Sequence, residues 1–147
     1  MNHYSLSFFV LIVLMLSLMC YGEDSKDSTF TVSGIITNYK PREALYFAMY
    51  PSQKDFKERN FYRKLWYKRN QLPGDTIRFE FTGVERGYYI IVGYQDMDGN
   101  GDINMGMFGP TEPYIVYLPN YGIFGPKFAK CKFLVDRDID TVRIIFK

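Results

Sequence analysis

From Thr29 onward, the chain repeatedly alternates apolar and polar residues with a period of two. In the clearest run, Thr76–Thr82, the side chains of Ile77, Phe79 and Phe81 fall on one side. Because successive side chains of a strand point to opposite faces, such runs indicate strands with one buried face. The pattern predicts strands at Thr29–Asn38, Ala44–Tyr50, Thr76–Thr82, Tyr88–Gln95, Tyr114–Leu118, Phe128–Val135 and Thr141–Lys147.

Residues that favour turns separate these runs, at 38–42, 73–75, 85–87 and 136–140. Short strands with such spacers favour an all-β fold, a single antiparallel β-sandwich of about seven strands. Strands do not alternate with long helical segments, so a doubly wound α/β fold is not expected. Aromatic residues make up 18% of the chain, nearly all of them tyrosine or phenylalanine, which also favours strands.

The first 22 residues resemble an export signal. Residues Phe8–Met19 form an apolar run that is shorter than the roughly 20 residues of a membrane-spanning helix. Such a run is typical of a signal peptide. We therefore expect a signal peptide at 1–22, a short polar tether at 23–28 and one β-sandwich domain at 29–147.

Cys20 gives the signal a second interpretation. Bacterial lipoproteins are cleaved just before a cysteine that is then acylated, and cleavage here would make residues 1–19 the signal. A third interpretation is an uncleaved anchor. All three place the domain outside the cytoplasm, either periplasmic, anchored to the outer membrane or secreted. Membrane contact would then occur only through the signal or a lipid anchor.

Histidine and cysteine are nearly absent. His3 and Cys20 lie in the predicted signal, so the exported domain keeps no histidine and one thiol, Cys131. This excludes Ser-His-Asp and Cys-His catalysis, histidine-based zinc or copper sites, and an internal disulfide. Cys131 alternates with apolar neighbours and is predicted to be buried on a strand. The net charge of +2 does not favour a nucleic-acid binder, and we expect a non-enzymatic protein.

A loop rich in oxygen ligands, Asp96–Asn104, directly follows the predicted strand Tyr88–Gln95. Its alternating ligands, a glycine at the sixth position and an apolar residue at the eighth resemble an EF-hand-type calcium loop. The twelfth position is Met107, where a bidentate glutamate belongs, so Glu112 would have to fold back and replace it. The candidate ligands are Asp96, Asp98, Asn100, Asp102 through its carbonyl, Asn104 and Glu112.

With the bidentate residue missing, we expect a structural Ca²⁺ site of weak affinity, about 10⁻⁴–10⁻³ M, as in extracellular modules. The alternative is a polar hairpin loop without a metal, because Asp, Asn and Gly favour turns for local reasons. Glu112 with Asp102 is also the pair of carboxylates available for acid–base chemistry. Their separation cannot be derived from the sequence.

Two further segments suggest binding surfaces. Residues 54–69 carry seven basic and two acidic residues, with aromatic residues between them at helical spacing. This segment is expected to form a short amphipathic helix that contacts an anionic surface, or to be a helix or irregular strand that covers one end of the sandwich. The loop 105–126 carries Tyr114, Tyr117 and Tyr121, which could stack on sugar rings. An adhesion, glycan-binding or anionic-surface-binding module is therefore the alternative function.

Four motifs in order resemble a bacterial secreted family filed as domain of unknown function 2141. They are Gly87-Tyr88-Tyr89, the Asp/Asn/Gly loop, Gly109-Pro110-x-Glu112 and Phe124-Gly125-Pro126-x-Phe128. The resemblance covers about residues 76–133. It implies a prealbumin-like or carboxypeptidase-regulatory-like β-sandwich and an extracytoplasmic location, and it implies no established activity.

Overall fold

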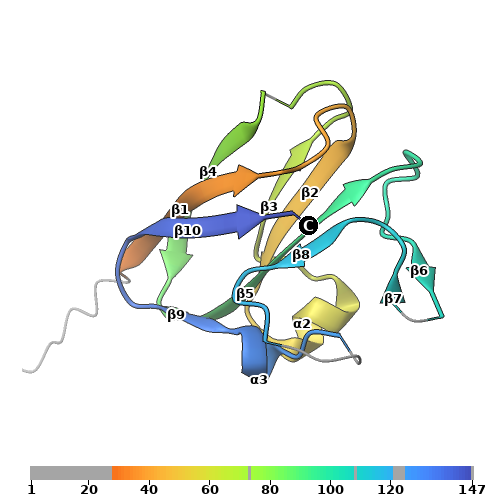
Figure 1. The fold of residues 1–147 in the computed structure, drawn as a ribbon. Coiled ribbons are helices and arrows are strands. Elements are labelled where there is room, and N and C mark those ends of the chain that lie inside the picture. The colour runs from red at the N-terminus through yellow and green to blue at the C-terminus, as the bar shows by residue number, and fades with distance from the viewer. Residues whose placement is uncertain (1–27, 73, 108, 121–124, 147) are drawn as a thin grey trace, which may run out of the picture.

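The computed structural model describes residues 28–72, 74–107, 109–120 and 125–146. The predicted signal, with Cys20, lies outside the described residues. Most of the described chain is strand, arranged in several sheets with short helices at one end (Figure 1). No helix in the described ranges is both long enough and apolar enough to cross a membrane.

The first sheet has the order β10-β1-β4. Its strands are β1 (Thr29–Thr37), β4 (Thr76–Glu85) and β10 (Ile139–Ile145). β1 runs antiparallel to β4 and parallel to β10, so the expectation of a purely antiparallel fold was wrong. The parallel pair forms because the chain enters β10 from the other sheet, beside the start of β1, where Val32 pairs with Ile139.

Close packing between β1 and β10 explains why residue 34 is a glycine. A Cβ atom at Gly34 would lie 2.0 Å from the carbonyl oxygen of Val142, far inside van der Waals contact. Gly34 therefore lets the two backbones approach as closely as they do.

The second sheet has the order β3-β2-β5-β8, and β9 pairs with the first residues of β5. Its strands are β2 (Ala44–Tyr50), β3 (Arg63–Tyr67), β5 (Gly87–Asp96), β8 (Tyr114–Val116) and β9 (Phe133–Val135). A small hairpin, β6 (Met105–Gly106) with β7 (Gly109–Pro110), extends beyond β5.

The predicted strand Phe128–Val135 is instead the helix α3 (Phe128–Cys131) followed by β9. The backbone N–H of Phe128 donates to the side-chain oxygen of Gln53 at 2.7 Å, which ties the start of α3 to α2 (Gln53–Glu58). Cys131 at the end of α3 is fully buried. Its predicted burial is confirmed, and its placement on a strand was wrong.

Residues 54–69 do not form a single helix. The hydroxyl of Ser52 caps the start of α2 by accepting from the N–H of Asp55 at 3.0 Å. After Glu58 the helix stops, because Arg59 is left-handed with a φ of 58°. The chain then forms the edge strand β3, in which Trp66 pairs with Tyr46. The helical spacing in the sequence is overridden because β3 completes its backbone hydrogen bonds with β2.

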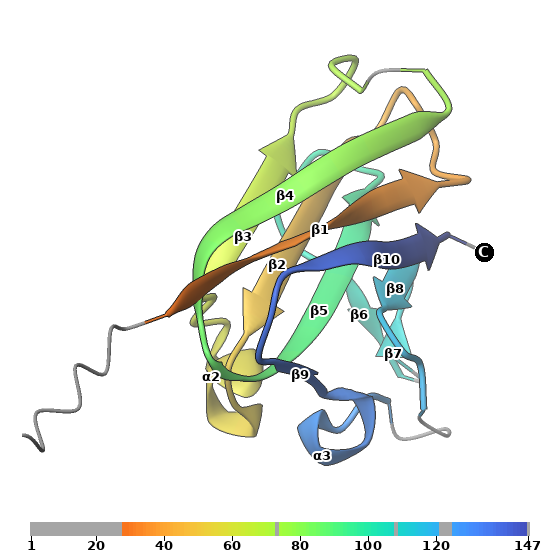
Figure 2. The ribbon, with the colours of Figure 1, turned by 90° about the vertical axis from the view of Figure 1, so that its left-hand side faces the viewer.

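The apolar faces of the two sheets meet in one core, and in Figure 2 the sheet β10-β1-β4 lies in front of the second sheet. The fully buried side chains of β2 pack against those of β1, β4 and β10. They include Leu45, Phe47, Met49, Ile36, Ile77 and Ile144, and Phe146, the residue after β10, belongs to the same core. A smaller cluster lies on the outer face of the second sheet under α3 and consists of Ile90, Val92, Val116 and Cys131.

Candidate functional site

The loop after β5 is wrapped around the carboxylate of Asp96, which is 2% exposed. This carboxylate accepts hydrogen bonds from the backbone N–H groups of Gly99 at 2.7 Å, Asn100 at 3.1 Å and Gly101 at 2.9 Å. Gly99 and Gly101 adopt left-handed φ values of 80° and 82°, which glycine reaches without steric cost. The two glycines thus allow the loop backbone to curl around one buried carboxylate.

Glu112 folds back onto this loop. Its Oε1 accepts from the N–H of Met97 at 2.7 Å, and its Oε2 accepts from the N–H of Asn104 at 3.0 Å. The β6–β7 hairpin makes this return, and the N–H of Thr111 donates to the carbonyl of Asn104 at 2.9 Å. Glu112 is buried and holds both ends of the loop.

Asp96, Asp98 and Glu112 bring one carboxylate oxygen each to within 4.8 Å of one another. Asp98 is exposed and accepts from the side-chain amide of Asn104 at 2.8 Å. This hydrogen bond, together with one from the backbone N–H of Asn100, lowers the pKa of Asp98 below its usual value. Asp98 therefore stays ionised at neutral pH beside two buried carboxyl groups.

Asn100 and Asn104, also predicted as ligands, lie beside the three carboxylates because both donate their amide NH₂ groups to Asp98. A side-chain amide can present either its nitrogen or its oxygen after a half turn. The same two residues can therefore serve as donors to Asp98 or as oxygen ligands. Ca²⁺ takes about six to eight oxygens, and this donor set has the right chemistry for it.

Asp102 is separated from this cluster. Its carboxylate pairs with the guanidinium of Arg59, and the two side chains are 59% and 52% exposed. The predicted role of Asp102 was to offer its backbone carbonyl, and that role stays a prediction, because the ion pair with Arg59 involves only the side chain. Sequence reasoning missed this ion pair because the two residues are 43 positions apart.

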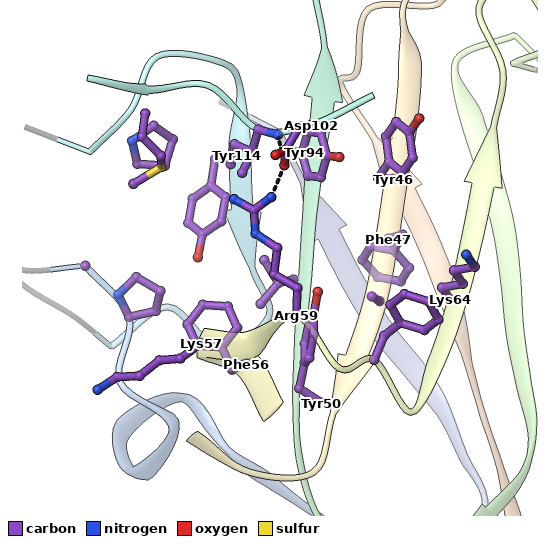
Figure 3. A pocket seen from close by; sticks show the side chains of 18 of the residues that line it. Tyr46, Phe47, Tyr50, Phe56, Lys57, Arg59, Lys64, Tyr94, Asp102 and Tyr114 are labelled. Atoms are coloured by element: carbon purple, nitrogen blue, oxygen red, sulfur yellow. Dashed lines mark hydrogen bonds and ion pairs between the residues drawn. The ribbon is translucent and has the colours of Figure 1, made fainter. Parts of the chain in front are cut away.

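The outer side of the same loop forms one wall of an open groove of about 1280 Å³ on the outer face of the second sheet (Figure 3). The floor comes from β2 and β5, and α2 forms the opposite wall. The floor residues are Tyr46, Ala48, Tyr50, Val92 and Tyr94, and the walls include Phe56, Lys57, Arg59, Phe61, Lys64, Ile103, Met105, Met107 and Tyr114.

An aromatic row crosses the sheet at one end of the groove. Tyr46 is stacked between Trp66, at 5.5 Å between ring centroids, and Tyr94, at 4.9 Å. The hydroxyl of Tyr94 donates to the carbonyl of Gly101 at 3.2 Å, so the row also supports the loop Asp96–Asn104. Burial raises the pKa of Tyr94, which keeps this donor protonated.

The tyrosines expected to stack on sugars have different positions. Tyr114 lines the groove, whereas Tyr117 packs edge-on against Phe133 of the main core at 5.2 Å. Tyr121 lies outside the described residues. The basic segment 54–69 and the loop 105–126, analysed separately in the sequence, line opposite sides of one groove.

The model of a family described as "Uncharacterized protein conserved in bacteria" (DUF2141) matches residues 35–143. This range contains all six candidate ligands and every residue that lines the groove. No curated protein and no solved structure matches the chain.

Proposed function

The chain belongs to the DUF2141 family, and we propose that it is an exported, non-enzymatic protein of the cell envelope with a structural Ca²⁺ site in the loop Asp96–Asn104. The observation that carries this proposal is the convergence of Asp96, Asp98 and Glu112 within 4.8 Å. A hard cation would compensate three carboxylates that otherwise repel one another.

A structural role fits the way the loop is built. Asp96 and Glu112 already organise the loop backbone through five backbone N–H groups, so an ion bound there would stabilise an arrangement that exists without it. The expected dissociation constant of about 10⁻⁴–10⁻³ M suits a compartment where calcium is millimolar.

The non-enzymatic part of the proposal is supported by the surroundings of the two candidate acid–base groups. Glu112 accepts backbone N–H groups with both oxygens, and Asp102 is paired with Arg59. The commitment of Glu112 to the loop backbone and the cationic partner of Asp102 both favour a non-enzymatic role. A carboxylate-dependent hydrolysis of a glycan or ester by the purified protein would contradict this part.

We further propose that the fold is a β-sandwich of the prealbumin-like or carboxypeptidase-regulatory-like type. Support comes from the shared core between the sheet β10-β1-β4 and the sheet β3-β2-β5-β8. An experimental structure with a different strand order, or with the sheets not facing each other, would overturn it.

A calcium melt tests the metal site. At about 10 mM Ca²⁺, a site with this affinity stabilises the folded state by roughly 1.4–2.7 kcal/mol. For a domain of this size, that raises the melting temperature by about 5–10 °C relative to chelator. Differential scanning calorimetry measures the shift.

Two variants sharpen the calcium melt. Asp98→Asn removes one ligand charge at an exposed position and is expected to abolish the calcium shift. Glu80→Gln removes an exposed charge on β4, far from the loop in sequence, and is expected to leave the shift unchanged. An unchanged melting temperature in the unsubstituted protein at this calcium concentration would exclude the site.

Export is tested with the full chain in a bacterial host. We expect the protein in an extracytoplasmic fraction, with its N-terminus created by cleavage after Gly22 or just before Cys20. Deleting residues 1–22 is expected to retain the protein in the cytoplasm. Palmitate label that is lost in Cys20→Ala would identify the lipoprotein form, and cytoplasmic, uncleaved full-length protein would refute export.

A further inference from the structure

We propose that the groove on the outer face of the second sheet binds an anionic amphiphile, a molecule with an apolar chain and a carboxylate or phosphate head. The loop Asp96–Asn104 forms one wall of this groove, α2 forms the opposite wall, and β2 and β5 form its floor. This inference goes beyond the proposed calcium site and does not depend on it, because the three converging carboxylates do not line the groove.

The interior of the groove suits an apolar chain. Its floor and walls are mainly aliphatic and aromatic, and its volume of about 1280 Å³ exceeds that of a typical small-molecule pocket. Met105 and Met107 on the hairpin side are 63% and 91% exposed, and Phe61 on the opposite side is 46% exposed. Flexible methionines around an apolar cleft are typical of surfaces that adapt to chain-like ligands.

The charges around the groove suit an anionic head. Among the lining residues, Lys57, Arg59 and Lys64 are cationic, and Asp102 is the carboxylate that faces them within the described chain. In Figure 3, Arg59 reaches across the pocket toward Asp102. A planar guanidinium binds carboxylate and phosphate groups through paired hydrogen bonds.

The ion pair between Arg59 and Asp102 can give way to such a head. Both side chains are more than half exposed, and exposed ion pairs contribute little stability. An anionic head that enters the groove would replace Asp102 as the partner of Arg59. Asp102 is thus a competitor of the ligand, and its removal is expected to strengthen binding.

Tyr46, at the centre of the aromatic row, offers no open ring face to a sugar in the groove. The ring faces of Tyr46 are covered by Trp66 and Tyr94, so its edge and not its face is turned toward the groove. Sugar rings bind through contact with open aromatic faces. An apolar chain has no such requirement and can lie along ring edges and side-chain methyl groups.

The test is calorimetric titration of the purified protein with decanoate and with decyl phosphate, each below its critical micelle concentration and in chelator. Decyl maltoside serves as the neutral ligand with the same chain, and acetate serves as the head without a chain. We expect decanoate and decyl phosphate to bind at least about tenfold more tightly than either comparison ligand.

Three variants assign the head to Arg59. Arg59→Met is expected to weaken decanoate binding about tenfold or more, because a charge-assisted hydrogen-bond pair is lost. Asp102→Asn is expected to strengthen it about 1.4- to fivefold, the fold-change that corresponds to the roughly 0.2–1 kcal/mol typical of an exposed ion pair. Lys130→Met removes an exposed charge from α3, outside the groove, and is expected to change nothing.

The opposite signs of the two groove variants separate this proposal from a folding defect, which could only weaken binding. Equal affinity for decyl maltoside, or unchanged binding in Arg59→Met, would overturn it. So would binding to phosphatidylglycerol vesicles or to a sulfated glycan without binding of the free amphiphiles. Failure of the calcium melt would leave this result untouched, because the titration is done in chelator.

Discussion

Replacing Phe47 with alanine is expected to lower the free energy of unfolding by about 3–5 kcal/mol, the range for truncating a buried phenylalanine. Phe47 lies on β2, is 1% exposed, and contacts Phe79 and Phe81 of the opposite sheet at 4.8 and 5.8 Å between ring centroids. The ring of Phe47 also covers Gly93 on the neighbouring strand β5, where a Cβ atom added to Gly93 would lie 2.8 Å from this ring. Urea unfolding followed by circular dichroism measures the loss.

Phe61→Ala is the matched control. Phe61 has the same side chain but is 46% exposed, so its truncation is expected to cost less than about 1 kcal/mol. If Phe47→Ala cost no more than Phe61→Ala, the two sheets would not share the core described above. Because both variants replace phenylalanine with alanine, the difference between their losses of stability tests whether the two sheets pack against each other at Phe47.

The strands with one buried face could be predicted because a strand fixes the side-chain period at two. Over Thr76–Thr82 of β4, the alternation in the sequence matches the burial residue by residue, with Ile77, Phe79 and Phe81 buried and the residues between them exposed. β1, β2, β5 and β10 follow the predicted runs closely. This information is local and needs no partner strand.

The direction of β10 and the existence of β3 and α3 depend on partners far away in the sequence. A period of two does not state whether a strand runs parallel or antiparallel, so the pairing of β10 with β1 could not be derived. In 128–135, the sequence alternation predicts that Ala129 and Cys131 lie on the same buried face of a strand. The chain instead forms the helix α3, which buries Cys131 and leaves Ala129 exposed.

The candidate metal site was predictable to the extent that it is local. The loop Asp96–Asn104 and the return of Glu112 lie within 17 consecutive residues, and the structure brings Glu112 back to the loop as expected. The groove was not predictable, because Arg59, Tyr46 and Tyr94 come from three separate elements. Only the folded sheet places the basic segment opposite the aromatic loop.

Replacing Glu112 with alanine is expected to lower the free energy of unfolding by about 2–4 kcal/mol in calcium-free buffer, since a buried charged acceptor of two backbone N–H groups is lost. The N–H groups of Met97 and Asn104 would have to find water instead. The same variant is expected to lose the calcium-dependent rise in melting temperature. Urea unfolding and calorimetry, each with calcium and with chelator, measure both effects.

Glu112→Gln separates the two roles of this side chain. It keeps the volume and one acceptor oxygen but removes the charge, so we expect a smaller loss of stability and a lost or strongly reduced calcium shift. A full calcium shift in Glu112→Ala would show that Glu112 only clamps the loop. The cation would then have to rely on Asp96 and Asp98, and the convergence of three carboxylates would no longer support a calcium site.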